Sequence, residues 1–259
     1  MRMPWSRREA PLLHVATDEG AGPVAILVHG IASSSVTFDE LVPRLVDTHR
    51  VIALDILGFG GSRAPANATF TIEEHAEALH ATIRSLRLSA PFVLVGHSLG
   101  SLISSRYAAD HPELVAKLVL VSPPIYLDPK AWGTPRDKAA MGAYLRVYEY
   151  LRANKAFTMR AAEAIDRISP IRNVLQVSES NWMAFTLSLQ NAIESQTTVA
   201  DIARVRVPVE IVYGTLDPFL MPGGIQIVGK MRHVTVHKVD AGDHLLRKRL
   251  AKAVAKVVG

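Results

Sequence analysis

An apolar run leads directly into a serine flanked by glycines in the stretch Phe92-Val93-Leu94-Val95-Gly96-His97-Ser98-Leu99-Gly100. Four consecutive apolar residues indicate a buried strand, and Leu102, Ile103 and Tyr107 continue the stretch at a spacing that predicts a helix. A serine at such a strand-to-helix turn takes a strained backbone conformation with positive φ, and the glycines leave room where strand and helix pack closely. The turn would present the hydroxyl to a substrate, although the same pattern also occurs around a serine with no role.

Composition points to an ordinary globular protein. The 259 residues are 49% hydrophobic and 20% charged, which suits one large domain or a core with an insertion. No apolar run reaches the roughly 18 residues that a membrane span needs. Residues Met1 to Glu9 carry three arginines without a following apolar segment, so we expect no signal peptide and no membrane insertion.

The absence of cysteine excludes disulfides, thiolate catalysis and cysteine-ligated zinc, and it agrees with a predicted cytoplasmic location. The net charge is +5, but the basic residues are scattered apart from short groups such as Arg247-Lys248-Arg249. That group lies in a segment where Leu246, Leu250 and Val254 recur at helical spacing, which indicates the solvated face of an amphipathic helix. We therefore expect no nucleic-acid partner; the oligomeric state is left open.

Strand and helix patterns alternate along much of the chain. The expected strands cover residues 12–16, 24–28, 51–55, 92–95, 118–121, 209–213 and 234–239, and the expected helices cover 38–46, 72–86, 99–110 and 224–231. Alternation of this kind predicts an α/β fold in which helices cover a mostly parallel central sheet.

One region breaks the alternation. Residues 125–200 contain no convincing strand, and helical patterns occur at 139–154, 161–168 and 182–196. Pro123-Pro124 precedes this region, and Val207-Pro208 follows it. We interpret residues 1–124 and 201–259 as the core and residues 125–200 as an inserted helical cap.

Polar loops follow several of the predicted strands, and ligand sites in such sheets form beyond the carboxyl ends of the strands. These loops contain His29-Gly30-Ile31-Ala32-Ser33, Gly214-Thr215-Leu216-Asp217-Pro218 and Asp240-Ala241-Gly242-Asp243-His244. Together with Ser98 they supply a nucleophile, an acid and a base in the chain order Ser, Asp, His, and a loop that could bind an oxyanion.

The sequence resembles the α/β-hydrolases that use a serine nucleophile and carry a helical cap. Five stretches match in order, from residue 24 to the C-terminus: Val28-His29-Gly30-Ile31, Asp55-Ile56-Leu57-Gly58-Phe59-Gly60-Gly61-Ser62, Gly96-His97-Ser98-Leu99-Gly100, Tyr213-Gly214-Thr215-Leu216-Asp217 and Gly242-Asp243-His244. The resemblance implies the α/β-hydrolase fold and a reaction that requires no cofactor and no metal.

The resemblance also implies a role for each matching residue. Ser98 would attack the substrate, His244 would take and return the proton, and Asp217 would hold the histidine ring. The backbone N–H groups of Ile31 and Leu99 would bind the oxyanion.

Several other polar residues compete for these roles. Asp240 is the stronger rival acid because it ends a strand, whereas Asp243 is too close to His244 in sequence to turn back onto the ring; Asp217 matches the family position. We expect His97 to support the serine turn. His75 and His80 are five residues apart and do not share a helix face, so a metal pair is not expected.

Asp55 and the glycines that follow it are expected to shape a loop beside the site. Leu57 stands where the family often has proline, which puts the rigidity of that loop in question. His29 is expected to order the oxyanion loop, and it is also a candidate substrate-binding residue.

Ser98 argues against epoxide hydrolases and haloalkane dehalogenases, which use an aspartate nucleophile. We expect hydrolysis of a small-molecule carboxylic ester with a small to medium acyl chain, through an acyl-enzyme. Two alternatives stay open: cleavage of a carbon–carbon bond in a diketone-type substrate by the same residues, and a non-catalytic receptor that binds a ligand in a hydrolase fold.

Aromatic side chains in and near the insertion are candidates for the substrate pocket, although apolar residues at helical spacing more often pack a core. The candidates are Tyr126, Tyr144, Trp182 and Phe219, with Trp132, Tyr148, Phe157 and Phe185 also in the insertion. Asn191, Glu194 and Gln196 either form hydrogen bonds within the cap or reach the substrate.

Overall fold

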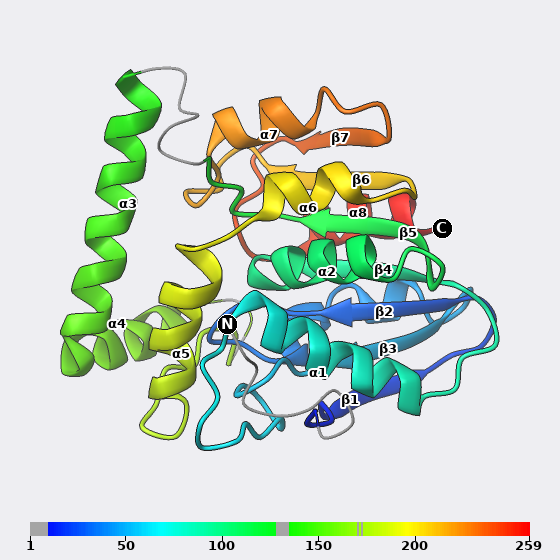
Figure 1. Ribbon diagram of the computed structural model, residues 1–259, viewed down its shortest axis with the longest axis horizontal. Helices are drawn as coiled ribbons and strands as arrows, with labels where there is room; N and C mark the ends of the chain where they lie inside the picture. Colours follow the sequence, from blue (N-terminus) through cyan, green and yellow to red (C-terminus); the bar gives the residue numbers. More distant parts are fainter. Residues whose placement is uncertain (1–9, 128–134, 170, 172) are drawn as a thin grey trace.

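The computed structural model describes residues 10–127, 135–169, 171 and 173–259. Within them, strands form one sheet in the order β1-β3-β2-β4-β5-β6-β7 (Figure 1). The strands are β1 (Val15–Glu19), β2 (Val24–Val28), β3 (Arg50–Leu54), β4 (Phe92–His97), β5 (Val115–Val121), β6 (Val209–Gly214) and β7 (Val234–Val239). Every neighbouring pair is parallel except β1 with β3. The predicted, mostly parallel sheet is confirmed.

Helices cover both faces of this sheet because alternate residues of each buried strand point to opposite sides. On one face, Ile26, Leu94 and Leu120 pack in a core that includes α1 (Ile72–Ser85) and α2 (Leu99–Asp110). On the other, Leu27, Val95 and Val119 pack in a second core with α8 (Lys248–Val258). The continuous apolar runs in the sequence therefore reflect burial on both sides.

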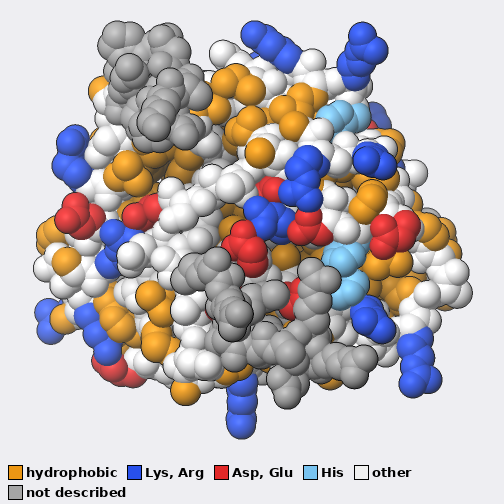
Figure 2. Space-filling model, viewed as in Figure 1, with side chains coloured by type: hydrophobic (Ala, Val, Ile, Leu, Met, Phe, Trp, Pro, Cys, Tyr) orange, Lys and Arg blue, Asp and Glu red, His pale blue; other side chains and the backbone are white. Residues whose placement is uncertain are grey.

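The helix α8 confirms the amphipathic interpretation of the C-terminal segment. Leu250, Val254 and Val258 are buried against the sheet, whereas Lys248 and Arg249 are exposed. On the face shown in Figure 2, basic and acidic side chains are interspersed.

The first strand begins later than predicted. Residues 12–16 were the expected strand, but β1 starts at Val15 and Leu12 is exposed. The cause is the register with the neighbouring strand, which pairs Asp18 with Ile52 and Glu19 with Val51. A short antiparallel edge strand of polar residues shows no apolar run that sequence periodicity could detect.

The predicted helix at residues 38–46 is wrong. The chain forms two short 3₁₀ turns instead, η1 (Ser35–Phe38) and η2 (Val42–Arg44). Pro43 has no backbone N–H and could not donate a helical hydrogen bond inside a longer helix. Phe38, Leu41 and Leu45 are nevertheless buried, which explains the helix-like spacing of the apolar residues.

Residues 125–200 are helical wherever the structure assigns them regular secondary structure. The helices are α3 (Pro135–Ala153), α4 (Lys155–Ile168), α5 (Trp182–Ser188) with a π-helical turn (η3, Leu189–Ile193), and the start of α6 (Thr198–Arg204). Figure 1 shows α3, α4 and α5 on the side of the sheet where the carboxyl ends of β2 and β5, marked by their arrowheads, lie.

The boundaries of some later helices also differ from those expected. Helix α4 begins at Lys155 rather than 161, and α7 (Pro222–Val228) starts and ends earlier than residues 224–231. Helix α6 crosses the predicted domain boundary at residue 200 and packs against α2. The division at residues 124 and 200 otherwise stays a prediction.

Candidate active site

Ser98 lies in a strained turn between β4 and α2. Its backbone has φ 53° and ψ −122°, the positive φ that the sequence predicted. A Cβ atom on Gly96 would lie 2.3 Å from the Gly100 carbonyl oxygen, and one on Gly100 would lie 2.1 Å from the Val28 carbonyl oxygen. Both distances are too short for any other residue, so the two glycines allow the strand and the helix to meet at this serine.

The loop after β2 packs directly against Ser98. A Cβ atom on Gly30 would lie 2.7 Å from the Ser98 Cβ atom, which places the Gly30 backbone beside the hydroxyl. Among the described residues, the backbone N–H groups of Ile31 and Leu99 donate no hydrogen bond. Two free N–H groups next to a serine hydroxyl could receive a negatively charged oxygen.

The loops that follow β6 and β7 bring Asp217 and His244 together. The backbone N–H of Leu216 donates to the Gly242 carbonyl at 2.8 Å, and that of Thr215 donates to the Val239 carbonyl at 3.0 Å. His244 Nδ1 then lies 2.9 Å from Asp217 Oδ2 and 3.0 Å from Oδ1. This geometry requires Nδ1 to carry the proton, so Nε2 is left to accept one.

Electrostatics keep the Asp217 carboxyl ionised. Burial by itself would raise its pKa, but the hydrogen bond from His244, the charge of that ring and the backbone N–H of Phe219 at 2.9 Å outweigh it. The pKa of Asp217 therefore lies below its usual value, and the ionised carboxylate can stabilise a protonated His244.

The rival acids are placed elsewhere. Asp240 is exposed at the end of β7, and Asp243 forms an ion pair with Arg247. His97 supports the site through its Nε2–H, which donates to the His244 carbonyl oxygen at 2.8 Å. Burial, together with the nearby His244, lowers the pKa of His97 to about 3, so its ring is neutral.

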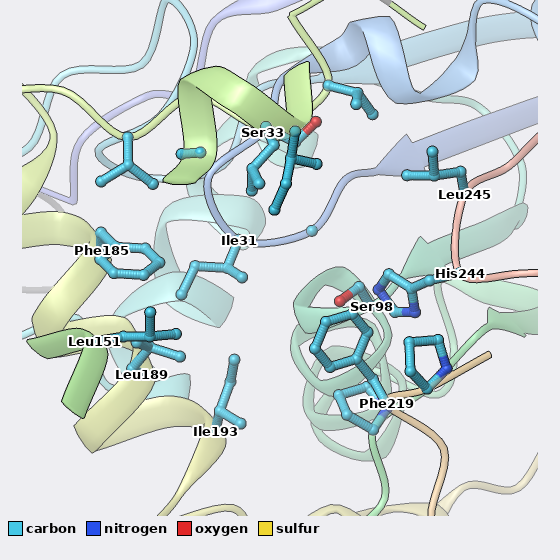
Figure 3. Close-up of a pocket in the computed structure, with 18 of the residues that line it drawn as sticks. Ile31, Ser33, Ser98, Leu151, Phe185, Leu189, Ile193, Phe219, His244 and Leu245 are labelled. Carbon is cyan, nitrogen blue, oxygen red and sulfur yellow. The ribbon is translucent and has the colours of Figure 1, made fainter. Parts of the chain in front are cut away.

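Ser98 and His244 lie side by side on the wall of one cavity of about 440 Å³ (Figure 3). Among the described residues, no hydrogen bond from the Ser98 hydroxyl to His244 is formed. Such contacts are often long without substrate and shorten in the reacting complex. Neither Lys nor Arg occurs among the described residues that line this cavity, and Asp243 is the acidic one.

Most of the cavity wall opposite Ser98 comes from the insertion. Helix α4 contributes a stripe at positions i, i+3, i+4 and i+7, which is Thr158, Ala161, Ala162 and Ile165. Phe185, Leu189 and Ile193 follow at intervals of four residues through α5 and η3, and Figure 3 shows them across the cavity from Ser98. The α4 stripe was not among the residues predicted to form the pocket, although its helical spacing was a usable signal.

Of the five predicted substrate-binding residues, Phe219 lines the cavity. Its ring meets the His244 ring edge to face, with centroids 4.8 Å apart. The cavity wall does not include Tyr126, Tyr144 or Trp182. The Tyr144 hydroxyl donates to the Pro218 carbonyl, and the Trp182 ring packs against Phe185 from outside. Tyr148 lines the cavity instead, and no feature of the sequence distinguished it from Tyr126 and Tyr144.

His29, the remaining predicted substrate-binding residue, does not have that position in the structure. It is fully buried behind the loop that follows β2 and does not line the cavity. Its Nδ1–H donates to the Gly30 carbonyl at 2.7 Å, and its Nε2 accepts the Ile56 N–H at 3.0 Å. Burial lowers the pKa of His29 to about 4, which keeps this neutral tautomer in place. His29 thus orders the loop, as one of the two predictions for it stated.

Asp55 and the glycines after it form the expected loop. Its carboxylate accepts the N–H groups of Ser35 and Gly61 at 2.8 Å, and the His14 ring lies 3.1 Å away. Leu57 in this loop is fully buried. These contacts join the loop after β3 to the one after β2.

The polar residues at the end of residues 125–200 form hydrogen bonds both within this segment and to the rest of the chain. Asn191 donates to the Thr69 carbonyl at 2.7 Å, and Glu194 pairs with Arg152. Gln196 accepts the Tyr126 N–H at 3.1 Å and donates to the Pro124 carbonyl at 2.9 Å. All three form hydrogen bonds within the protein, and none lines the cavity.

In the part of the chain that the structure describes, no group of three or more metal-ligating side chains gathers. None of the described helices has the length and apolar character needed to cross a membrane. Trp132 and the N-terminal residues on which the signal-peptide prediction rests lie outside the described residues.

Residues 23–166, more than half of the chain, match the profile of the alpha/beta hydrolase fold family. A probable lysophospholipase of Arabidopsis thaliana, BODYGUARD 3, is 38% identical over 116 residues, which cover 43% of this chain and 23% of that protein. The 2-(acetamidomethylene)succinate hydrolase of Mesorhizobium japonicum is 32% identical over 140 residues, covering 54% and 49% of the two chains. The chain thus spans about a quarter of the plant relative and half of the bacterial one.

Solved structures agree on the fold. A thermophilic esterase from Thermogutta terrifontis superposes with a TM-score of 0.71 at 22% identity, covering 95% of this chain and 92% of the esterase. At that identity the likeness shows the fold alone. The parallel sheet, the serine turn and the family match lead to one conclusion: the chain belongs to the α/β-hydrolase fold family.

Proposed function

We propose that the protein is a serine hydrolase that cleaves carboxylic esters with small to medium, uncharged acyl groups. The observation that carries the proposal is the joint placement of Ser98 and the Asp217–His244 pair at one cavity. The finer assignment, a carboxylesterase that requires no cofactor, goes beyond the family and rests on this geometry.

In the proposed reaction His244 Nε2 takes the Ser98 proton while Oγ attacks the ester carbonyl. The oxyanion accepts hydrogen bonds from the N–H groups of Ile31 and Leu99, each worth about 3–4 kcal/mol in the transition state. His244 then protonates the departing alcohol, which leaves an acyl group on Ser98. A water molecule, deprotonated by the same nitrogen, releases the acid and restores the hydroxyl.

The composition of the cavity supports the acyl class. Apolar residues of α4, α5 and η3 face the serine, and without a lining Lys or Arg an anionic acyl group would lose its hydration without gaining a partner. We propose that residues 125–200 act as the cap that forms this acyl pocket. The cytoplasmic location stays a prediction from the cysteine-free sequence.

The test is hydrolysis of p-nitrophenyl esters from acetate to decanoate by the wild type and by Ser98→Ala. We expect turnover by the wild type and none above background by the variant. Ser104→Ala is the matched control, because Ser104 lies in α2, the helix that follows Ser98, and its buried hydroxyl has no hydrogen-bond partner among the described residues. A fluorophosphonate should label the wild type and the control but not Ser98→Ala.

Two results would replace the proposal. Cleavage of a 1,3-diketone with poor ester turnover would favour carbon–carbon bond hydrolysis by the same residues. Ligand binding without labelling of Ser98 and without turnover would favour a non-catalytic receptor.

A further inference from the structure

Three tyrosines gather where the insertion meets the loop that carries Asp217. The ring centroids of Tyr126, Tyr144 and Tyr148 lie 6.1 to 6.4 Å from one another. The Tyr126 and Tyr148 hydroxyl oxygens are 2.5 Å apart, and the Tyr144 hydroxyl donates to the Pro218 carbonyl. The cluster therefore lies beside the loop that carries Asp217.

The hydroxyl groups of Tyr126 and Tyr148 have one proton more than their mutual hydrogen bond uses. Each tyrosine hydroxyl has one proton to donate, and the Tyr126–Tyr148 contact uses one of the two. Among the described residues, neither hydroxyl has another hydrogen-bond partner. One buried O–H group therefore remains without an acceptor in the protein, and leaving it so would cost free energy.

Tyr148 is the member of the pair that can use this proton on a ligand. It lines the cavity, whereas Tyr126 does not. Burial raises the pKa of Tyr148 to about 12, so the hydroxyl remains a donor at neutral pH. When Tyr126 donates to the Tyr148 oxygen, it also polarises the Tyr148 O–H bond and strengthens it as a donor.

Other side-chain hydroxyls on the wall, apart from Ser98, already have partners within the protein. Thr158 donates to the Leu151 carbonyl at 2.7 Å. Thr37 and Ser33 share a hydrogen bond of 2.8 Å, and Ser33 in turn donates to the Ser34 carbonyl at 3.5 Å, so both of their protons are used. Tyr148 is therefore the lining residue, apart from Ser98, whose hydroxyl belongs to a pair with one proton left to donate.

We propose that Tyr148 determines specificity by donating a hydrogen bond to a neutral oxygen in the acyl chain. The substrate class is then an ester whose apolar acyl group carries one keto, ether or hydroxyl oxygen close to the scissile carbonyl. A carboxylate is disfavoured at this position because Asp243 lines the cavity and neither Lys nor Arg is among the described residues that do. This inference rests on the proposed ester hydrolysis.

The kinetic test compares p-nitrophenyl octanoate with octanoates that carry a ketone at positions 3 to 6. We expect at least one ketone position to raise kcat/KM about 5- to 10-fold in the wild type, as one neutral hydrogen bond can. Tyr148→Phe should abolish that ratio. Tyr144→Phe should keep it, because the Tyr144 hydroxyl is bound to Pro218 and does not line the cavity.

A binding test separates this inference from the proposed reaction. In the Ser98→Ala background, 2-octanone should bind about 5- to 10-fold more tightly than 2-methyl-1-octene, a shape analogue without the oxygen, and Tyr148→Phe should reduce that preference. The N–H groups of Ile31 and Leu99 are present both in Ser98→Ala and in the double variant with Tyr148→Phe. A difference in ketone preference between these two variants therefore reports on Tyr148.

The outcomes are distinct. Loss of all ester turnover with a Tyr148-dependent ketone preference would overturn the reaction and keep the recognition. Turnover of plain octanoate with no ketone preference, or a preference that survives Tyr148→Phe, would overturn the recognition and keep the reaction.

Discussion

The loops that follow the strands of the sheet (here called the rim) and the helices of residues 125–200 form two sides of one cavity, and different interactions hold them in place. At the rim, backbone contacts fix the reacting residues: Gly30 and Gly100 have no room for a side chain, and Thr215 and Leu216 are hydrogen-bonded to the loop before His244. In residues 125–200, buried apolar side chains such as Ala162 and Leu189 form the wall through van der Waals packing.

The insertion is also the more exposed of the two regions. Several large apolar side chains on α3, α4 and α5 face solvent, namely Val147, Tyr150, Phe157, Ile168 and Met183. Under the proposed function, the reaction depends on backbone contacts that tolerate little change, whereas the choice of acyl group depends on the volume of the cavity and on single side chains such as Tyr148. The predictions below test that division.

The largest effect is expected from acid, which should destabilise the fold through three buried histidines outside residues 125–200. Burial lowers the pKa of His29 to about 4 and those of His75 and His97 to about 3, so all three are neutral in the folded protein. In the unfolded chain the same histidines bind protons below about pH 6.5. The free energy of unfolding therefore decreases as the pH falls from about 6.5 toward the pKa values of the folded state. We expect a loss of about 2 kcal/mol for each histidine at pH 5, measured by urea unfolding.

Residues 125–200 contain no histidine, so this acid sensitivity belongs to the core. His75→Gln should remove about a third of the pH dependence, because glutamine can still bond to Ser188 without titrating. Equal stability at pH 8 and pH 5 would show that these rings are not buried in the neutral form.

Removing the charge of Asp217 should lower kcat about 10⁴-fold in Asp217→Asn, because the amide holds the His244 ring in the wrong tautomer and cannot stabilise its protonated form. Steady-state hydrolysis of p-nitrophenyl butyrate measures the change. Asp240→Asn, at the exposed rival position, should retain wild-type rates. The reverse ranking of these two variants would reassign the acid.

Two glycine-to-alanine variants compare how well the rim and residues 125–200 accommodate an added side chain. Gly100→Ala forces a Cβ atom to 2.1 Å from the Val28 carbonyl and should cost about 3 kcal/mol or prevent folding. In α3, a Cβ atom on Gly142 would meet nothing closer than 3.9 Å, so Gly142→Ala should stabilise the protein by up to about 1 kcal/mol. Thermal unfolding distinguishes them; similar shifts in both would remove the contrast.

The smallest effect is expected from filling the acyl pocket. Ala162 is buried on the cavity wall, so Ala162→Leu should lower the decanoate-to-butyrate ratio of kcat/KM about 10-fold, equal to about 1.4 kcal/mol. Ala164→Leu places the same side chain on the exposed face of α4 and should leave the ratio as it is. An unchanged ratio in Ala162→Leu would place the acyl chain elsewhere.

Local sequence patterns predicted the parts of the fold that depend on local chemistry. The apolar runs gave the central strands because burial on both faces requires unbroken apolar sequence, and the glycines around Ser98 predicted its positive φ. The helix predicted at 38–46 failed because burial of Phe38, Leu41 and Leu45 imitates helical spacing while Pro43 prevents the helix. Edge strand β1 failed because its register is set by β3 and not by its own side chains.

By itself, the sequence determined the strand–turn–helix around Ser98, the order of the loops that follow the strands and the apolar character of the insertion, since each depends on residues close together in the chain. Only the tertiary structure decided that Asp217 rather than Asp240 meets His244, that His29 lies behind the loop, and that Tyr148 rather than Tyr126 or Tyr144 lines the cavity. Those choices depend on how segments distant in sequence pack against one another, and neighbouring residues of the same type carry no signal that distinguishes them.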